Sequence, residues 1–472
     1  MKNNYFDFYL NLLAFSALIF LLISPLFREG LFLDGLTYAA IAKNMANNKG
    51  TLWQPFYTES LFFSFYEHPP LGLYLQSLFF KVLKNTRIVV GFYNLIHFLF
   101  SIFIIHQTLK HFIAEASLKR IWILLFSWQF LALTIWTYKN NMLEVTFSSF
   151  ILLCFFFLLK SISSSGIKRL FFYMLASSSM LFAFLTKGPV SLFPAGTIFL
   201  WYLIFKSKQM IKATCLSFYF LITLCLTSFI FFYFNPDALK NINEYLTIQL
   251  LSSLSGERGG LSWGIDRFFI LWSVISRLSP LILITIILWQ KKLINKEHYK
   301  PALFFLMIAL FGTLPICLSP RQSGFYAIPA YFFYLLSFLC IATSALTELS
   351  SHIKTKQIYY TKKISIIIFI SSIIYFFSFI NIPNRNKELI HDLNILKKYI
   401  PKDTKFQISK KLKDDWGLHA YIALYLESSL FIQDQDFLIS YKNDRTVGHS
   451  TYKKIAPQTK YLQILEKIKT NP

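Results

Sequence analysis

The chain of 472 residues is 55% hydrophobic and 19% aromatic but only 15% charged, and its 47 Lys and Arg against 23 Asp and Glu give a formal net charge of +24. Soluble domains carry about 25% charged residues, and this chain also contains 53 Phe and has a mean hydropathy of +0.49. This composition excludes a soluble multidomain protein. It also excludes a disordered, collagen-like or disulfide-framework chain. The positive residues lie between apolar runs and not on one soluble face, so nucleic-acid binding cannot be inferred from the net charge alone. Five cysteines lie in apolar stretches without CxxC or Cys/His ligand spacing, and we interpret them as core residues. They are Cys154, Cys215, Cys225, Cys317 and Cys340.

Apolar runs recur at the length of about 20 residues that crosses about 30 Å of hydrocarbon. The sequence therefore predicts an all-α polytopic membrane protein with about 11, and up to 13, transmembrane helices. The first run lacks a small-residue cleavage site, so it is predicted to be a retained span and not a signal peptide. The short run 71–83 follows Pro69-Pro70 and is predicted to lie on the membrane surface. The predicted spans are 10–27, 88–105, 121–137, 143–159, 170–185, 190–205, 214–234, 268–289, 302–318, 325–346 and 364–380.

The distribution of Lys and Arg predicts the orientation of the spans, because basic loops stay in the cytoplasm. Every second loop is basic, as expected if basic loops all lie on one side of the membrane. Eleven spans keep this alternation along the whole chain. The N-terminus is then inside, whereas loop 28–87, loop 235–267 and the tail are outside. The basic loops contain Lys110, Lys119, Arg120, Lys160, Lys168, Arg169, Lys206, Lys208, Lys212, Lys291, Lys292, Lys296, Lys300, Lys354, Lys356, Lys362 and Lys363.

The first outer loop contains the most informative residues. Asp34 opens a predicted helix on which Tyr38 lies one turn later, and its plain structural interpretation is an N-cap. Further on, Glu67 and His68 precede two prolines that fix an extended backbone and end any helix. The alternative here is a polar turn before a surface helix.

Charged residues also occur at the outer ends of later spans, where membrane insertion does not require them. Glu144 begins the fourth span, where the helix dipole alone favours a carboxylate. Lys187 precedes Gly188-Pro189 in a very short outer loop, and Arg321 lies in a second short loop. Arg258, with Glu257 before it and Gly259-Gly260 after it, is typical of a mobile lid segment.

The tail changes character after residue 380. We predict two domains, a transmembrane domain 1–380 and a small α/β domain 381–472 outside the membrane. The predicted elements of the tail are helices at 386–399 and 458–469 and strands at 405–409, 429–433 and 437–441. The chain has no internal repeat and no inverted repeat of the kind seen in transporters.

Carboxylates and cations on different spans are thus predicted to converge at one membrane level. Cations at that depth suit a lipid-linked phosphate or diphosphate, and a carboxylate there could deprotonate a hydroxyl or amine. Phosphate is a good leaving group, so this set of residues fits glycosyl transfer from a polyprenyl-phosphate sugar.

These motifs, in order and spacing over roughly residues 10–345, resemble the C-type (GT-C) polyprenyl-phosphate-dependent glycosyltransferases. The most similar group is the bacterial family related to dolichyl-phosphate-mannose protein mannosyltransferases, which includes the lipid A aminoarabinose transferase. Gly35 departs from the Asp-Glu pair that family members often have at the first acidic site. The matching residues are Asp34 with Tyr38, the run Tyr66-Glu67-His68-Pro69-Pro70, Glu144, Lys187-Gly188-Pro189, and Ser319-Pro320-Arg321 leading to Tyr326-Ala327-Ile328-Pro329-Ala330.

The resemblance implies a multi-pass protein of the bacterial inner membrane that transfers a sugar from undecaprenyl phosphate to a lipid such as lipid A, a glycan or a protein on the periplasmic face. It implies a catalytic role for Asp34, a second acidic role for Glu144 and donor-phosphate contacts from Lys187 and Arg321. Tyr38, Glu67, His68, Tyr326 and Arg258 would shape the site. No cofactor is implied, and use of a divalent cation stays open. The alternatives are a flippase of lipid-linked sugars, which would need ionisable groups at mid-span, and a membrane scaffold that displays the tail.

Overall fold

The computed structural model describes residues 2–252, 255, 264–408, 412–442, 452–455 and 458–468. The chain folds as two compact units, each built from segments that are distant in the sequence. Loop 28–87 belongs to the same unit as the tail. The membrane unit comprises Met1–Ser24, Asn94–Tyr138 and Glu144–Ser378, and the loop–tail unit comprises Pro25–Tyr93, Lys139–Leu143 and Phe379–Pro472.

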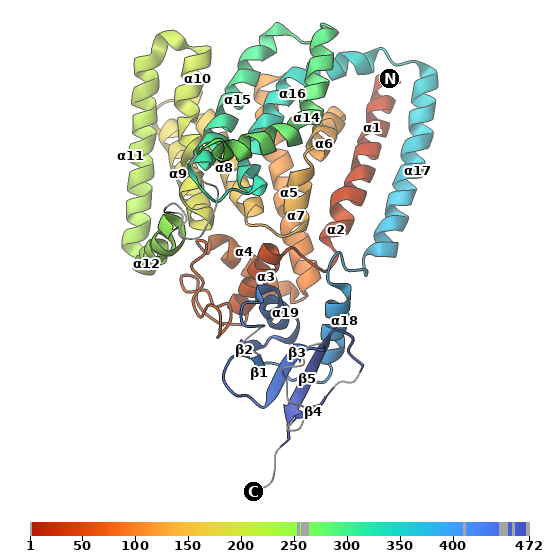
Figure 1. Ribbon diagram of the computed structural model, residues 1–472. Helices are drawn as coiled ribbons and strands as arrows, with labels where there is room; N and C mark the ends of the chain where they lie inside the picture. Colours follow the sequence, from red (N-terminus) through yellow and green to blue (C-terminus); the bar gives the residue numbers. More distant parts are fainter. Residues whose placement is uncertain are drawn as a thin grey trace. The chain divides into compact units, whose positions relative to one another are not determined.

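Within the described residues, nine helices are long and apolar enough to cross a membrane, and each matches one of the eleven predicted runs. Helix α1 continues through a π-helical turn (Ile19–Ile23) into α2 (Ser24–Leu26). Figure 1 shows the helices of the membrane unit running alongside one another. These nine segments, some extended by adjoining 3-10 or π turns, contain α1 (Lys2–Leu18), α5 (Thr86–Phe112), α8 (Glu144–Ile162), α9 (Gly166–Lys187), α11 (Met210–Phe234), α14 (Phe269–Gln290), α15 (Tyr299–Thr313), α16 (Ile328–Ser351) and α17 (Thr355–Phe379).

The other two predicted runs are interrupted helices. Run 121–137 forms α6 (Ile121–Gln129) and α7 (Ala132–Lys139), and the segments that contain them are bent by 87°. Run 190–205 is a 3-10 segment (Pro189–Gly196) followed by α10 (Thr197–Phe205). Pro194, inside the 3-10 segment, lacks the backbone N–H that a continuous α-helix needs, which explains why α10 begins only at Thr197. The predicted polytopic helical fold is confirmed.

Helix α16 lies at the centre of the membrane unit, packed against α8, α14 and α15. In the most apolar stretch of segment Gly324–Ser351, 72% of the residues are buried. The corresponding shares are 17% for Ser207–Phe234 and 11% for Thr355–Phe379. Exposed apolar side chains such as Phe229 and Ile367 cover these two outer helices. Such surfaces suit lipid contact, because hydrocarbon is as apolar as the side chains themselves.

The loop–tail unit combines a five-stranded sheet with helices from both ends of its sequence. The strand order is β2-β1-β3-β5-β4, in which β1 is parallel to β2 and β3, and β5 is antiparallel to β3 and β4. One apolar core joins α3 and α19, with Leu36, Ile41 and Ile422 among its buried members. The elements are α3 (Leu33–Ala46), α4 (Leu71–Leu83), α18 (Lys387–Leu396), α19 (Trp416–Leu426), β1 (Lys405–Ile408), β2 (Ser429–Phe431), β3 (Phe437–Tyr441), β4 (Tyr452–Lys454) and β5 (Leu462–Lys467).

The predicted helix 458–469 is wrong, because this segment forms β5. The Asp392 carboxylate accepts the backbone N–H groups of Lys460 and Leu462, both at 2.8 Å, and directs the chain into the sheet. In the sheet, β5 pairs with β3 on one edge and with β4 on the other. Helix α19 was not predicted, whereas the three predicted strands form within two residues of their expected ends.

Candidate active site

Asp34 is the second residue of α3 and not its N-cap, so the N-cap interpretation is wrong. The N-cap is Phe32, whose N–H donates to Asn140 Oδ1 at 2.9 Å. Residues 35–45 of the helix are all buried, whereas Asp34 is half-buried. The helix therefore fixes the backbone of Asp34 and leaves part of the residue accessible.

Gly35 is required by a close approach of the chain. A Cβ atom at this position would lie 1.7 Å from the backbone oxygen of Asn140. Asn141 Nδ2 donates to Gly35 O at 3.0 Å, and Gln76 Nε2 donates to Asn141 Oδ1 at 2.6 Å. Segment 139–143 thus ties α3 to α4. The departure from the family's Asp-Glu pair at Gly35 has a steric cause.

Tyr38 and His68 meet in the loop–tail unit, with ring centroids 5.8 Å apart in an edge-to-face arrangement. Tyr38 is buried on α3, and His68 and Glu67 are half-buried just before Pro69 and Pro70. Pro70 is the N-cap of α4. Two of the predicted site-shaping residues are therefore in contact.

A cavity of about 430 Å³ is lined by Leu33 and Leu36, the neighbours of Asp34 on α3, and by Arg385. The Arg385 guanidinium lies 5.7 Å from the centre of the Phe32 ring. Burial lowers the pKa of Lys139, and the nearby positive charges of Arg385 and Arg28 lower it further. Lys139 stands beside an outer span end, where its charge already invited a functional interpretation, whereas Arg28 and Arg385 join it only through folding.

Glu144 and Lys187 form a buried ion pair in the membrane unit. Glu144 is the first residue of α8 and Lys187 the last of α9, and the two helices pack together. Their side chains are 1% and 11% exposed. Glu144 Oε2 is buried and has no hydrogen-bond partner among the described residues. One carboxylate oxygen is thus neutralised, and the other is left as an acceptor.

Aromatic rings surround the Lys187 ammonium, which lies 5.3 Å from the centre of the Tyr326 ring and 6.0 Å from that of Phe325. Gly188 follows with φ of +80°, and a Cβ there would lie 2.6 Å from Tyr245 Oη. Tyr245 donates to Lys187 O at 3.4 Å, and burial raises the pKa of its hydroxyl to about 12. The turn therefore needs glycine, and it fixes the position of Lys187.

Arg321 lies in the turn 318–324 with an exposed side chain, and its carbonyl accepts from Ser319 Oγ at 2.9 Å. Two further arginines approach the same turn. Arg267 is buried and donates to Leu318 O at 2.8 Å. Arg277 donates to Ser273 O at 3.0 Å, and its guanidinium carbon would lie 3.0 Å from a Cβ on Gly324.

Arg277 is a candidate that the sequence analysis missed. It lies inside the apolar helix α14, where an ionisable residue indicates function by default, and this was the available signal. No carboxylate pairs with it among the described residues. The predicted Arg258, with Glu257, lies outside the described residues. The part of the chain that the structure describes holds no group of three or more His, Cys, Asp or Glu that could bind a metal ion.

Comparisons with known proteins agree on the fold. A family model described as dolichyl-phosphate-mannose-protein mannosyltransferase matches residues 67–233. ArnT from Cupriavidus metallidurans bound to undecaprenyl phosphate matches with a TM-score of 0.64 and 12% identity over 98% of both chains. The apo state matches with a TM-score of 0.62 and 12% identity, over 95% of this chain and 96% of that chain. No curated protein sequence matches.

The resemblance inferred from the motifs is thereby confirmed, and the chain has a fold similar to that of ArnT over nearly its whole length. The family match includes His68, Glu144 and Lys187, whereas Asp34 and Arg321 lie outside residues 67–233. The roles of the individual site residues stay predictions.

Proposed function

We propose that the protein is a glycosyltransferase of the bacterial inner membrane. It transfers a sugar from an undecaprenyl-phosphate donor to a lipid such as lipid A, a glycan or a protein on the periplasmic face. The observation that carries the proposal is the buried Glu144–Lys187 pair, with one carboxylate oxygen left as an acceptor, in a chain with the fold of ArnT.

In the proposed reaction an acceptor hydroxyl or amine attacks the anomeric carbon of the sugar. The bond between that carbon and the phosphate oxygen breaks, and its electron pair leaves with undecaprenyl phosphate. Asp34 takes the acceptor proton as general base. Glu144 orients the acceptor by accepting a hydrogen bond at Oε2, while the ion pair with Lys187 keeps its charge in place.

The cations near the turn 318–324 suit the donor phosphate. Arg321 is exposed there and can bind a phosphate bidentately, and Arg277 carries a charge that no described carboxylate balances. Lys187 already neutralises Glu144, so we assign it to the electrostatic environment of both groups and not to phosphate alone. A positive surface at this point stabilises the phosphate as it departs.

A transfer assay in detergent micelles separates this proposal from the flippase alternative, which Arg277 in α14 could support. Micelles have no two sides, so translocation gives no signal there, whereas a transferase still forms a covalent product. We expect purified protein to move radiolabelled sugar from undecaprenyl phosphate onto an envelope extract. Mass spectrometry of envelope glycolipids and glycans from a deletion strain then identifies the acceptor. Normal envelope glycans in that strain, together with no transfer in micelles, would overturn the proposal.

A further inference from the structure

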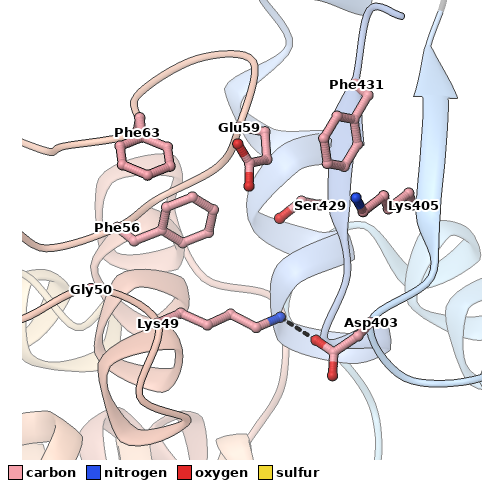
Figure 2. Close-up of a pocket in the computed structure, with 9 residues that line it drawn as sticks. All are labelled: Lys49, Gly50, Phe56, Glu59, Phe63, Asp403, Lys405, Ser429 and Phe431. Carbon is pink, nitrogen blue, oxygen red and sulfur yellow. Dashed lines mark hydrogen bonds and ion pairs between the residues drawn. The ribbon is translucent and has the colours of Figure 1, made fainter. Parts of the chain in front are cut away.

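The loop–tail unit contains a second pocket whose lining the proposed mechanism does not use. Its volume is about 310 Å³, at the lower end of the range of about 300–1,000 Å³ for small-molecule sites. Figure 2 shows the Phe56 and Phe63 rings on one side, Phe431, Ser429 and Lys405 on the other, and the Glu59 carboxylate pointing into the space between them.

The first wall is a tightly held segment of the first loop. Residues 58–62 form a turn closed by the Thr58 N–H, which donates to Phe62 O at 3.2 Å, and Thr58 Oγ1 accepts from the backbone of the same turn. Phe56 is 7% exposed, and its ring packs edge-to-face on Phe63 at 5.7 Å. Phe63 itself is 68% exposed. The turn therefore precedes an aromatic ring that is exposed to solvent and lines the pocket.

The second wall is the outer face of the sheet edge. Strand β2 is the edge strand, and Lys405 of β1 pairs in register with Ser429 of β2. Because side chains alternate along a strand, Phe431 lies on the same face as Ser429, while Leu430 enters the core. The Lys405 ammonium lies 5.4 Å from the centre of the Phe431 ring.

The charges of the pocket balance. Lys49 pairs with Asp403 and also donates to Glu427 O at 3.1 Å, so this ammonium is already neutralised (Figure 2). Lys405 and Glu59 add one charge of each sign. In the described part of the chain, no hydrogen bond or ion pair engages the Glu59 carboxylate or the Ser429 hydroxyl.

We propose that this pocket binds one neutral sugar ring of the acceptor. An aromatic face accepts the apolar C–H face of a sugar, and a carboxylate, a hydroxyl and an ammonium at its edge take the hydroxyl groups. A phosphate or other anion would meet Glu59 without a surplus of positive charge, and a cation would meet Lys405. The small volume and the balanced charge therefore favour a single neutral ring over a peptide or an anionic headgroup.

This assignment to the acceptor rests on the proposed glycosyl transfer, but binding of the sugar is measurable without it. Full-length protein in nanodiscs is examined by saturation-transfer NMR with methyl glucoside, methyl mannoside and methyl N-acetylglucosaminide, and with glucose 1-phosphate as the anionic probe. We expect saturation of at least one neutral glycoside. Phe63→Ala should raise its dissociation constant about three- to tenfold, as expected for loss of one ring contact, and Glu59→Gln should weaken binding as well.

Matched substitutions on the same unit serve as controls. Tyr399→Ala removes an aromatic ring that is 53% exposed elsewhere on the tail, and Asp434→Asn removes an exposed carboxylate. Both should bind the glycoside as the wild type does. Absence of saturation with every neutral probe, preference for glucose 1-phosphate, or unchanged binding by Phe63→Ala and Glu59→Gln each overturns the proposal.

The transfer assay then locates the sugar within the reaction. Phe63→Ala should raise the KM for acceptor about three- to tenfold and leave kcat and the KM for donor unchanged. If no transfer occurs while glycoside binding depends on Phe63, the proposed function fails and the sugar pocket stands. If transfer occurs with an unchanged acceptor KM in Phe63→Ala, the acceptor assignment fails and the proposed function stands.

Discussion

At the scale of one residue, the catalytic role predicted for the Asp34 carboxylate can be tested separately from its contribution to helix stability. Asp34 lies in the first turn of α3, where a carboxylate stabilises a helix by about 0.3–1 kcal/mol through the helix dipole, but it is not the cap. Its substitution by an amide therefore removes little stability. A proton acceptor at this position, by contrast, cannot be replaced by an amide.

We predict that Asp34→Asn abolishes sugar transfer while lowering the free energy of unfolding by less than about 1 kcal/mol. Asp237→Asn is the matched control, because Asp237 also lies in the first turn of a helix, α12 (Pro236–Glu244). It should show the same small loss of stability with full activity. Transfer rates and thermal unfolding are measured for both variants. Near-native transfer by Asp34→Asn would show that this residue is not the base.

Glu144 and Lys187 had been assigned separate roles from the sequence, and the structure pairs them. Removal of one partner leaves a buried charge uncompensated, which typically costs about 3–5 kcal/mol. We therefore predict that Lys187→Met is strongly destabilised and inactive, and that adding Glu144→Gln restores much of the stability but no activity. Thermal unfolding of both single variants and the double variant gives the coupling energy.

Arg321 provides the contrast for this pair, because its side chain is exposed. Arg321→Ala should lower transfer at limiting donor and leave the unfolding temperature unchanged. For the Glu144–Lys187 pair, equal stability of the Lys187→Met variant and the wild type would contradict the interpretation that the pair is buried and stabilising.

At the scale of elements, a glycine decides whether α3 can lie against segment 139–143. The neighbours of Gly35 are backbone atoms, which cannot rotate away as a side chain can. We predict that Gly35→Ala costs at least about 3 kcal/mol, at the upper end of overpacking effects. Gly196→Ala is the control, since the nearest atom to its added Cβ is a Phe311 ring carbon at an ordinary 3.4 Å. Both are compared by thermal unfolding, and equal unfolding temperatures would contradict the close approach.

Helix α19 carries a buried histidine, His419, whose protonation we expect to destabilise the loop–tail unit. His419 is buried, its Nε2–H donates to Lys413 O at 3.0 Å, and Nδ1 has no hydrogen-bond partner among the described residues. A proton on Nδ1 would therefore have no acceptor. Burial lowers the pKa of His419 to about 4, from an ordinary value near 6.5.

The folded state therefore binds fewer protons than the unfolded state between about pH 6.5 and 4, so stability is lost as the pH falls through this window. The full difference corresponds to about 3 kcal/mol. We predict that thermal unfolding between pH 7.5 and 4.5 shows this loss, and that His419→Gln reduces it. His391→Gln, at an exposed site, should keep the wild-type pH dependence. If the His419→Gln variant kept the wild-type pH dependence of unfolding, the loss of stability could not be assigned to His419.

At the scale of the whole molecule, the orientation in the membrane is still a prediction from the basic loops. We expect an impermeant thiol reagent to label single cysteines at Phe63 and Tyr399 in intact spheroplasts, and a cysteine at Lys168 only after lysis. All three side chains are exposed, so access depends on the side of the membrane. The background must lack the five natural cysteines, of which Cys215 and Cys225 are exposed. Labelling at 168 but not at 63 in spheroplasts would invert the topology.

The sequence by itself determined the membrane class, the positions of the apolar helices and the motifs that resemble the GT-C family. These properties are local, because a run of about 20 apolar residues is sufficient to define a span. Tertiary structure decided the remainder. Segment 458–469 has a helical pattern but becomes a strand, since Asp392 and two partner strands satisfy its backbone. The Glu144–Lys187 pair, the arginines near the turn 318–324 and the pocket beside Glu59 join residues far apart in sequence, and only the packing of helices and strands brings such side chains within reach of one another.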